Sequence, residues 1–157
     1  MKIQSLLRNL GAVFAAAGFF FTACAANVVI QVDKSNGAVV TRLKNVEMGD
    51  VPDIGGKPND RFSYGQAYES PDGLSVVYRG LVAAGGKIAL HETGSRYVLY
   101  VVRGKGVLYN TDPAGKETSR LDYAPGDVIV FEPKTWHGWT NGPAEFEFIG
   151  FDSPKVK

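Results

Sequence analysis

Short apolar runs, separated by clusters of Gly, Pro, Asn and Asp, follow one another along most of the chain. Beyond residue 26, no long stretch keeps the i, i+3, i+4, i+7 apolar spacing of an amphipathic helix. The runs are short, rich in Val, Tyr and Phe, and recur at intervals of roughly 8–12 residues, which is typical of sandwiches and barrels. We therefore expect an all-β chain whose sheet closes on itself.

Turn residues delimit the strands that these runs predict. Ser35-Asn36-Gly37 separates the first two strands, and a loop rich in Pro and Gly is expected over residues 49–60. The pair Gly85-Gly86 is expected to divide two later strands. The predicted strands are 28–32, 38–46, 61–69, 74–83, 86–92, 96–103, 106–111, 119–123, 127–132 and 144–151.

Alternation within two of the runs points to an interior space. Both alternating faces of residues 96–103 are apolar, which predicts a central strand covered on both sides or a strand that lines a cavity. In residues 86–92, alternation places His91 on one face together with Lys87 and Ala89. If that face is the interior, the barrel contains an imidazole.

The first 26 residues have the pattern of a targeting signal. Lys2 and Arg8 precede an uninterrupted apolar segment over 10–21, and small residues follow it. The segment is shorter than the roughly 18–20 residues of a membrane-spanning helix, although Ala25 and Ala26 lengthen the run and leave an uncleaved anchor as the alternative. We expect residues 1–23 to be a signal peptide and the protein to be exported to the periplasm.

Two cleavage modes fit the residues around Cys24. Ala23-Cys24-Ala25 has the small-x-small pattern of an ordinary signal peptidase site, which would release a soluble protein. Phe21-Thr22-Ala23-Cys24 resembles the lipobox of bacterial lipoproteins, although Phe21 stands where that motif usually has Leu. Cys24 is the only cysteine of the chain, which favours lipidation at this residue and a protein anchored to the membrane by its lipid.

Composition narrows the chemistry that the chain can perform. Its 157 residues suffice for one ordinary domain, and a formal net charge of +1 lacks the basic surplus of a nucleic-acid binder. A single cysteine excludes a disulfide framework and a cysteine-built zinc site. Only two histidines, His91 and His137, are available for metal or acid–base chemistry.

The spacing of two residue groups identifies a family resemblance. The first group is Gly85 or Gly86, His91, Thr93, Tyr97 and Gly104, and the second is Gly126, His137 and Asn141, with Pro133 one place late. In these positions the chain resembles the cupin superfamily. The resemblance implies a cupin-type double-stranded β-helix, or jelly-roll barrel, over residues 60–151. A signal peptide at 1–23, strands and a loop at 24–59 and a tail at 152–157 complete the expected organisation.

Departures from the cupin pattern bear on metal binding. A typical cupin site has three His and one Glu, whereas here Thr93 replaces the second His and Tyr97 replaces the Glu. Two imidazoles, His91 and His137, with a hydroxyl and a phenol would hold a divalent metal weakly. Glu145 or Glu147 could supply a carboxylate if either points inward. The cofactor is therefore left open, with a divalent metal as one possibility.

The resemblance implies a function for the pocket without metal. His91, His137 and Tyr97 would act as acid–base groups of a metal-independent isomerase, epimerase or lyase. Thr93 and two tryptophans near the pocket mouth, Trp136 and Trp139, would bind the small-molecule ligand. The alternatives are a metal-dependent dioxygenase or lyase with an atypical ligand set and a non-catalytic binding module.

Assembly and partners complete the expectations. Many cupins pair by exchanging N-terminal strands, and residues 27–46 suit that role, so we expect a homodimer. No nucleic-acid partner is expected, and contact with a membrane is expected only through the signal or a lipid anchor.

Overall fold

The chain is built of β-strands throughout the part that the structure describes. The computed structural model describes residues 28–35, 38–53 and 55–153. Within these ranges strands follow one another without a helix, and no helix that could span a membrane is found there. The expected all-β class is confirmed.

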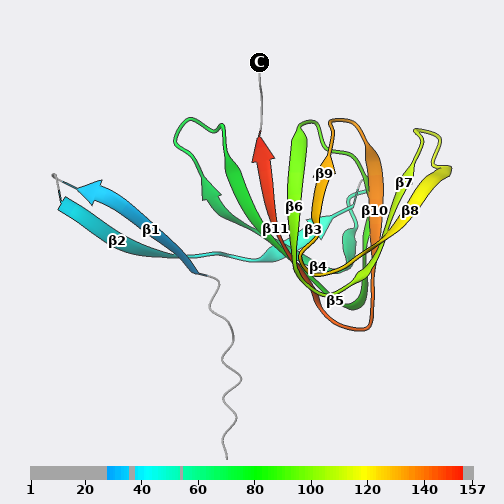
Figure 1. Cartoon of the computed structure of the whole chain (residues 1–157), viewed down its shortest axis with the longest axis horizontal. Helices are drawn as coiled ribbons and strands as arrows, with labels where there is room; N and C mark the ends of the chain where they lie inside the picture. Colours follow the sequence, from blue (N-terminus) through cyan, green and yellow to red (C-terminus); the bar gives the residue numbers. More distant parts are fainter. Residues whose placement is uncertain (1–27, 36–37, 54, 154–157) are drawn as a thin grey trace, which may run out of the picture.

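The strands alternate with short turns in the order that Figure 1 labels. They are β1 (Val28–Ser35), β2 (Ala38–Asn45), β3 (Gly49–Pro52), β4 (Pro58–Glu69), β5 (Val76–His91), β6 (Arg96–Arg103), β7 (Gly106–Thr111), β8 (Glu117–Tyr123), β9 (Val128–Phe131), β10 (Trp136–Asn141) and β11 (Phe146–Ser153).

One long strand, β5, organises a curled sheet. The sheet has the order β8-β7-β10-β5-β11-β6-β9, with β4 also paired to β5 and β3 paired to β4. The first half of β5 pairs with β11 and its last residues pair with β10, all antiparallel. Strand β5 thus connects the part of the sheet that contains β11 with the part that contains β10, and the sheet curls around an interior (Figure 1). The β1–β2 hairpin forms a separate two-stranded sheet that projects from this barrel.

The structure corrects the predicted break at Gly85-Gly86. Strand β5 continues through this pair, and the register between β4 and β5 shifts there, from Asp60 opposite Lys87 to Phe62 opposite Val82. The extra residues form a bulge, in which Gly85 adopts a φ of +67°. A glycine pair inside a strand therefore marked a bulge and not a turn.

One further prediction about the elements was wrong, and one strand was not predicted. Residues 49–60, expected as a loop, contain β3 and the start of β4. Residues 136–141, which lie between the expected strands 127–132 and 144–151, form β10. Gly138 stands in this strand for a packing reason. The Tyr109 ring lies where a Cβ at Gly138 would be.

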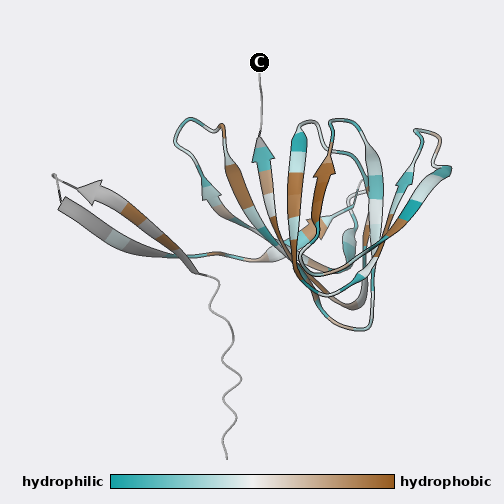
Figure 2. Cartoon of the chain, in the orientation of Figure 1, coloured by the Kyte–Doolittle hydropathy of each residue, from teal (hydrophilic) through white to brown (hydrophobic). Residues whose placement is uncertain are grey.

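The interior is packed at one end and hollow at the other. The packed end is filled by side chains from the inner faces of the strands, among them Val82, Val101 and Phe146, each at most 1% exposed. Figure 2 shows apolar bands on β5, β6, β9 and β11, the strands that surround this region. The hollow end lies where β6 begins and β11 ends, and it carries the candidate site.

Asn141 stabilises the packed end. Its side chain is 5% exposed, and Nδ2 donates to the carbonyls of Val82, Ala83 and Ala144 at 3.0, 2.8 and 2.8 Å. The amide thereby joins the end of β10 to β5 and to the turn before β11. This residue of the second motif has a structural role in the barrel.

Replacing Asn141 is expected to destabilise the barrel, and a charged replacement should lower the free energy of unfolding more than a neutral one. Asn141→Ala leaves buried carbonyls without their donor and should cost about 1–3 kcal/mol of unfolding free energy. Asn141→Asp brings a carboxylate against those carbonyls and should cost about 3–5 kcal/mol. Urea unfolding measures both. Asn110→Ala, which loses an exposed bond to Ser119, is the control, and equal stability of Asn141→Asp and wild type would contradict the assignment.

Candidate functional site

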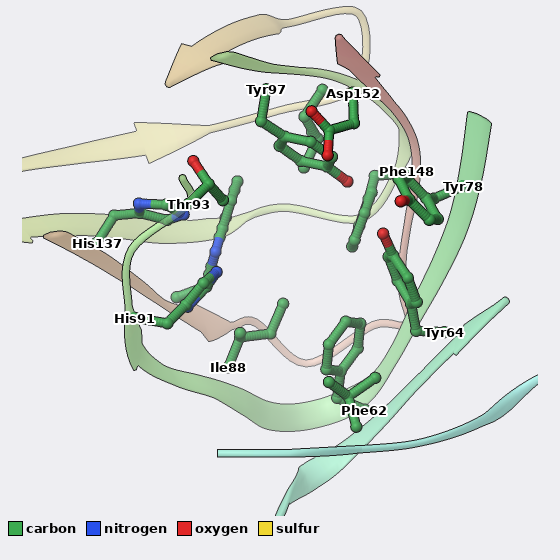
Figure 3. A pocket seen from close by; sticks show the side chains of 13 residues that line it. Phe62, Tyr64, Tyr78, Ile88, His91, Thr93, Tyr97, His137, Phe148 and Asp152 are labelled. Atoms are coloured by element: carbon green, nitrogen blue, oxygen red, sulfur yellow. The ribbon is translucent and has the colours of Figure 1, made fainter. Parts of the chain in front are cut away.

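A pocket of about 260 Å³ occupies the hollow end of the barrel. Its walls are aromatic and aliphatic, with Phe62, Ile88, Leu99, Trp139 and Phe148 among the lining residues. Polar groups gather at two sides of the pocket, as Figure 3 shows. We name these the imidazole pole (His91, His137 and Thr93) and the phenol pole (Tyr64, Tyr78, Tyr97 and Asp152).

Strand pairing brings the two histidines together. His91, the last residue of β5, lies directly opposite His137 of β10 in the antiparallel register. Their ring centroids are 4.3 Å apart, and Phe131 stacks on His137 at 3.8 Å. The sequence placed these residues in one site, and the structure makes them cross-strand neighbours.

A second irregularity in β5 decides which of its residues face the pocket. The register shifts between His137 opposite His91 and Trp139 opposite Ile88, so β5 has one residue more than β10 here. Ile88 and His91 consequently both line the pocket. The predicted face of Lys87, Ala89 and His91 is therefore wrong, because strict alternation does not survive a bulge.

Backbone carbonyls fix the tautomer of both rings. Nδ1 of His91 lies 2.8 Å from the carbonyl oxygen of Ala89, and Nδ1 of His137 lies 2.9 Å from that of Thr135. A carbonyl can only accept, so each Nδ1 carries the proton and donates it. In the neutral rings, Nε2 is the unprotonated nitrogen that is left to meet a ligand.

Burial keeps both imidazoles neutral. His137 is 1% exposed, and desolvation together with the nearby His91 lowers its pKa to about 4. Desolvation also lowers the pKa of His91. Both rings are therefore bases or metal ligands at neutral pH, and they are not cationic groups.

The residues around the imidazole pole do not fit a divalent metal. In the described part of the chain, no group of three or more His, Cys, Asp or Glu side chains is placed to hold a metal ion. Thr93 donates its hydroxyl proton to the carbonyl of Ser95 at 2.9 Å. The two imidazoles alone fill half of a tetrahedral shell and a third of an octahedral one, and no carboxylate or thiolate of the described residues joins them at this pole.

The two glutamates considered as further ligands are engaged elsewhere. Glu147 bonds to Arg79 at 2.7 Å and to Arg103 at 2.8 Å, and Glu145 also pairs with Arg103. Glu147 is on the opposite face of β11 from Phe148, which lines the pocket. Neither carboxylate lines the pocket.

The phenol pole was only partly predicted. Tyr97 of β6 lines the pocket as expected, and Tyr64, Tyr78 and Asp152 join it from β4, β5 and β11. The rings of Tyr64 and Tyr78 stack at 4.7 Å, and Asp152 lies opposite Tyr97 in the strand register. Alternation could have identified the additional residues, because Phe62 and Tyr64, like Val76 and Tyr78, are two positions apart on inner faces.

Burial keeps the phenols of this cluster protonated. Tyr64 is within hydrogen-bonding reach of both Tyr97 and Tyr78. Burial raises the pKa of Tyr64 and of Tyr97 far above the usual phenol value, and a weaker effect of Asp152 adds to both. Ser95 donates to Asp152 at 2.5 Å, so the carboxylate is held at the edge of the phenol cluster.

The two tryptophans separate to opposite faces of β10. Trp139 is 3% exposed and lines the pocket wall, away from the expected position at its mouth. Trp136 lies in a different hollow, together with Asn110 and Thr135. Because the two residues are three positions apart in a strand, they point to opposite sides. The structure thus gathers His91, Thr93, Tyr97, His137 and Trp139 but not Trp136, and Cys24 lies outside the described residues.

Comparison with known proteins gives matches at the level of structure. No protein-family model matches the chain, and neither does any curated protein. The chain is similar to a cupin 2 conserved barrel domain protein from Rhodopseudomonas palustris, with a TM-score of 0.59 and 18% identity over 74% of this chain and 77% of that one.

Two other solved structures carry names that describe an activity. The polyketide cyclase RemF from Streptomyces resistomycificus matches with a TM-score of 0.56 and 21% identity, over 70% of this chain and 75% of that one. A structure of DMSP lyases matches with a TM-score of 0.57 and 16% identity, over 69% of this chain and 57% of that one. At these identities the likeness extends to the barrel fold alone.

The depressed pKa of His137 makes stability depend on pH. Below about pH 6.5 the unfolded chain binds a proton at this residue, whereas the folded chain binds it only near pH 4. The free energy of unfolding should therefore fall as the pH decreases from 6.5 to 4, by up to about 3 kcal/mol from this group. Urea unfolding at several pH values measures the slope. His137→Asn should have a shallower slope, and identical slopes would rule out the assignment.

Proposed function

The chain has the fold of the cupin superfamily, and on this basis we propose that it is a metal-independent enzyme that moves a proton on a small molecule bound in its barrel. The structural neighbours named as a cyclase and a lyase support small-molecule chemistry in this fold. The reaction class is isomerisation, epimerisation or elimination, since each begins with removal of a proton.

One observation carries this proposal. Two neutral imidazoles, each with its unprotonated Nε2 left for a ligand, share a pocket with a protonated phenol. A general base and a hydrogen-bond donor on one substrate are the minimum for proton transfer on a molecule that carries a carbonyl group. The surrounding aromatic walls exclude water, which strengthens both interactions.

The residues divide the steps between them. His137 acts as the base that takes a proton on Nε2, and the stacking of its ring on Phe131 and the bond from Nδ1 to the carbonyl of Thr135 support this role. Charge then develops on the substrate oxygen, and Tyr97 stabilises it by donating its hydroxyl hydrogen bond. His91 shares the position of the base, because its own Nδ1 is likewise occupied. Return of the proton to a different atom or face completes an isomerisation, and loss of a neighbouring leaving group completes an elimination.

Exchange of hydrogen for deuterium tests this function without knowledge of the natural substrate. A panel of small hydroxyketones incubated with the protein in D₂O should gain deuterium at acidic C–H positions, as followed by NMR. His137→Ala and Tyr97→Phe should each slow the exchange by about 10²–10⁴-fold. The control is Tyr68→Phe, which changes a 37% exposed phenol of β4 that lies outside the pocket and outside the exposed apolar face described below. Ligand binding without exchange in the wild type would assign a non-catalytic binding module instead.

We also propose that the protein is a homodimer in which each β1–β2 hairpin contacts the barrel of the other copy. An isolated two-stranded hairpin is marginally stable, and Ile30 and Val32 of β1 are each 66% exposed. The outer barrel face is apolar and exposed along β6, β9 and β11, at residues Tyr100, Val102, Val128, Val130 and Phe151. Exposed apolar patches of this kind are typical of association surfaces.

Export through a signal peptide at residues 1–23 remains part of the proposal, with lipid attachment at Cys24. The support comes from the sequence, because these residues lie outside the described ones.

Native mass spectrometry of the protein produced with its leader in a Gram-negative host tests both statements. We expect a dimer whose subunit starts at Cys24 and carries the mass of a lipid modification. Val130→Asp should reduce the dimer fraction, because it places a charge in the exposed apolar face. A monomeric wild type would contradict the assembly, and a subunit of full sequence mass would contradict cleavage.

A further inference from the structure

The charges around the pocket limit the ligands that it can bind. Asp152 is the one ionisable acid that lines it, and no Lys or Arg lines it in the described part of the chain. Lys87 is exposed, and Arg96 lies outside in an ion pair with Glu132 at 3.0 Å. A carboxylate or phosphate entering this pocket would lose its hydration and find no cation.

The two poles offer different hydrogen-bonding partners. At the imidazole pole, Nε2 of His91 and of His137 can only accept while the rings are neutral, so they select a hydroxyl or N–H of the ligand. At the phenol pole, the protonated Tyr64 and Tyr97 can donate to a ligand oxygen. Figure 3 shows the two poles on opposite sides of the pocket.

Aromatic side chains line the space between the poles. Trp139 and Phe148 are parallel within 2° at a centroid distance of 6.5 Å, and Phe62 lies 6.2 Å from Phe148 at 29°. All three line the pocket together with Ile88 and Leu99. Flat apolar walls of this kind favour a planar ring over a flexible polar chain.

We propose that the ligand is an uncharged planar ring compound with a hydroxyl or N–H donor at one end and a carbonyl acceptor at the other. The donor binds the imidazole pole and the acceptor binds the phenol pole. Tyr64 is then a specificity-determining residue, because it presents its hydroxyl from β4 beside Tyr97. This inference rests on the proposed function for the identity of the site, and it adds the class of substrate.

A matched pair of probes tests the charge preference. 6-Acetyl-2-naphthol has a donor and a carbonyl at opposite ends, and 6-hydroxy-2-naphthoate replaces the ketone by a carboxylate. Titration calorimetry at pH 7 should show the ketone binding at least about tenfold more tightly. Equal affinity, tighter binding of the carboxylate, or failure of both probes to bind would overturn the proposal.

A variant tests the orientation of the ligand. Tyr64→Phe should lower the affinity for 6-acetyl-2-naphthol by about 5–30-fold, because one hydrogen bond to the ketone is lost. The affinity for 2-naphthol, which lacks the carbonyl acceptor, should change by no more than about twofold. Tyr68→Phe, which changes an exposed phenol on the same strand as Tyr64, should change neither affinity. An equal loss for both probes would show that Tyr64 acts on packing alone and would contradict the assigned orientation.

The outcomes separate this inference from the proposed function. Tight binding of the ketone without catalysed deuterium exchange would contradict the enzymatic function and leave the ligand class intact. Exchange catalysed on substrates that carry a carboxylate would contradict the ligand class and leave the function intact.

Discussion

The site depends on the pairing of β5 with β10 at one point, His91 opposite His137. The bulge in β5 brings His91 to the inner face beside Ile88, and the carbonyls of Ala89 and Thr135 bind the two Nδ1 atoms. Main-chain geometry thus sets the position and the tautomer of both imidazoles without help from any carboxylate. A strand without the bulge would direct one imidazole outward.

Burial in this pocket disfavours the charged forms of its side chains, and the effect applies to both poles. Burial lowers the pKa of the histidines and raises that of Tyr64 and Tyr97, so all four side chains are held in their neutral forms. Neutral bases facing neutral donors suit a reaction in which a proton moves within the pocket and no net charge enters it. In a metal-dependent cupin a bound cation would change this balance, but the donors here are too few to hold one firmly.

The fold class and much of the site could be predicted from the sequence. Turn residues and short Val-rich runs predicted most strands, and the resemblance to cupins implied that His91, Tyr97 and His137 share one pocket. Strand β10 and the sides of Trp136 and Trp139 were not predicted, because residues 136–141 were left between two expected strands and alternation was not applied to them. Bulges in β5 were also invisible, since they depend on contacts such as Arg61 with the carbonyls of Ala84 and Gly85.

The central claim is that both histidines are neutral, protonated at Nδ1 and free at Nε2. Long-range ¹H–¹⁵N NMR correlation spectra of the wild-type protein at pH 7 measure this directly, because protonated and unprotonated ring nitrogens differ widely in chemical shift. We predict the Nδ1–H tautomer for His91 and for His137, with Nε2 unprotonated and not bound to metal. An Nε2–H tautomer, an imidazolium or a metal-shifted Nε2 at either residue would contradict the account.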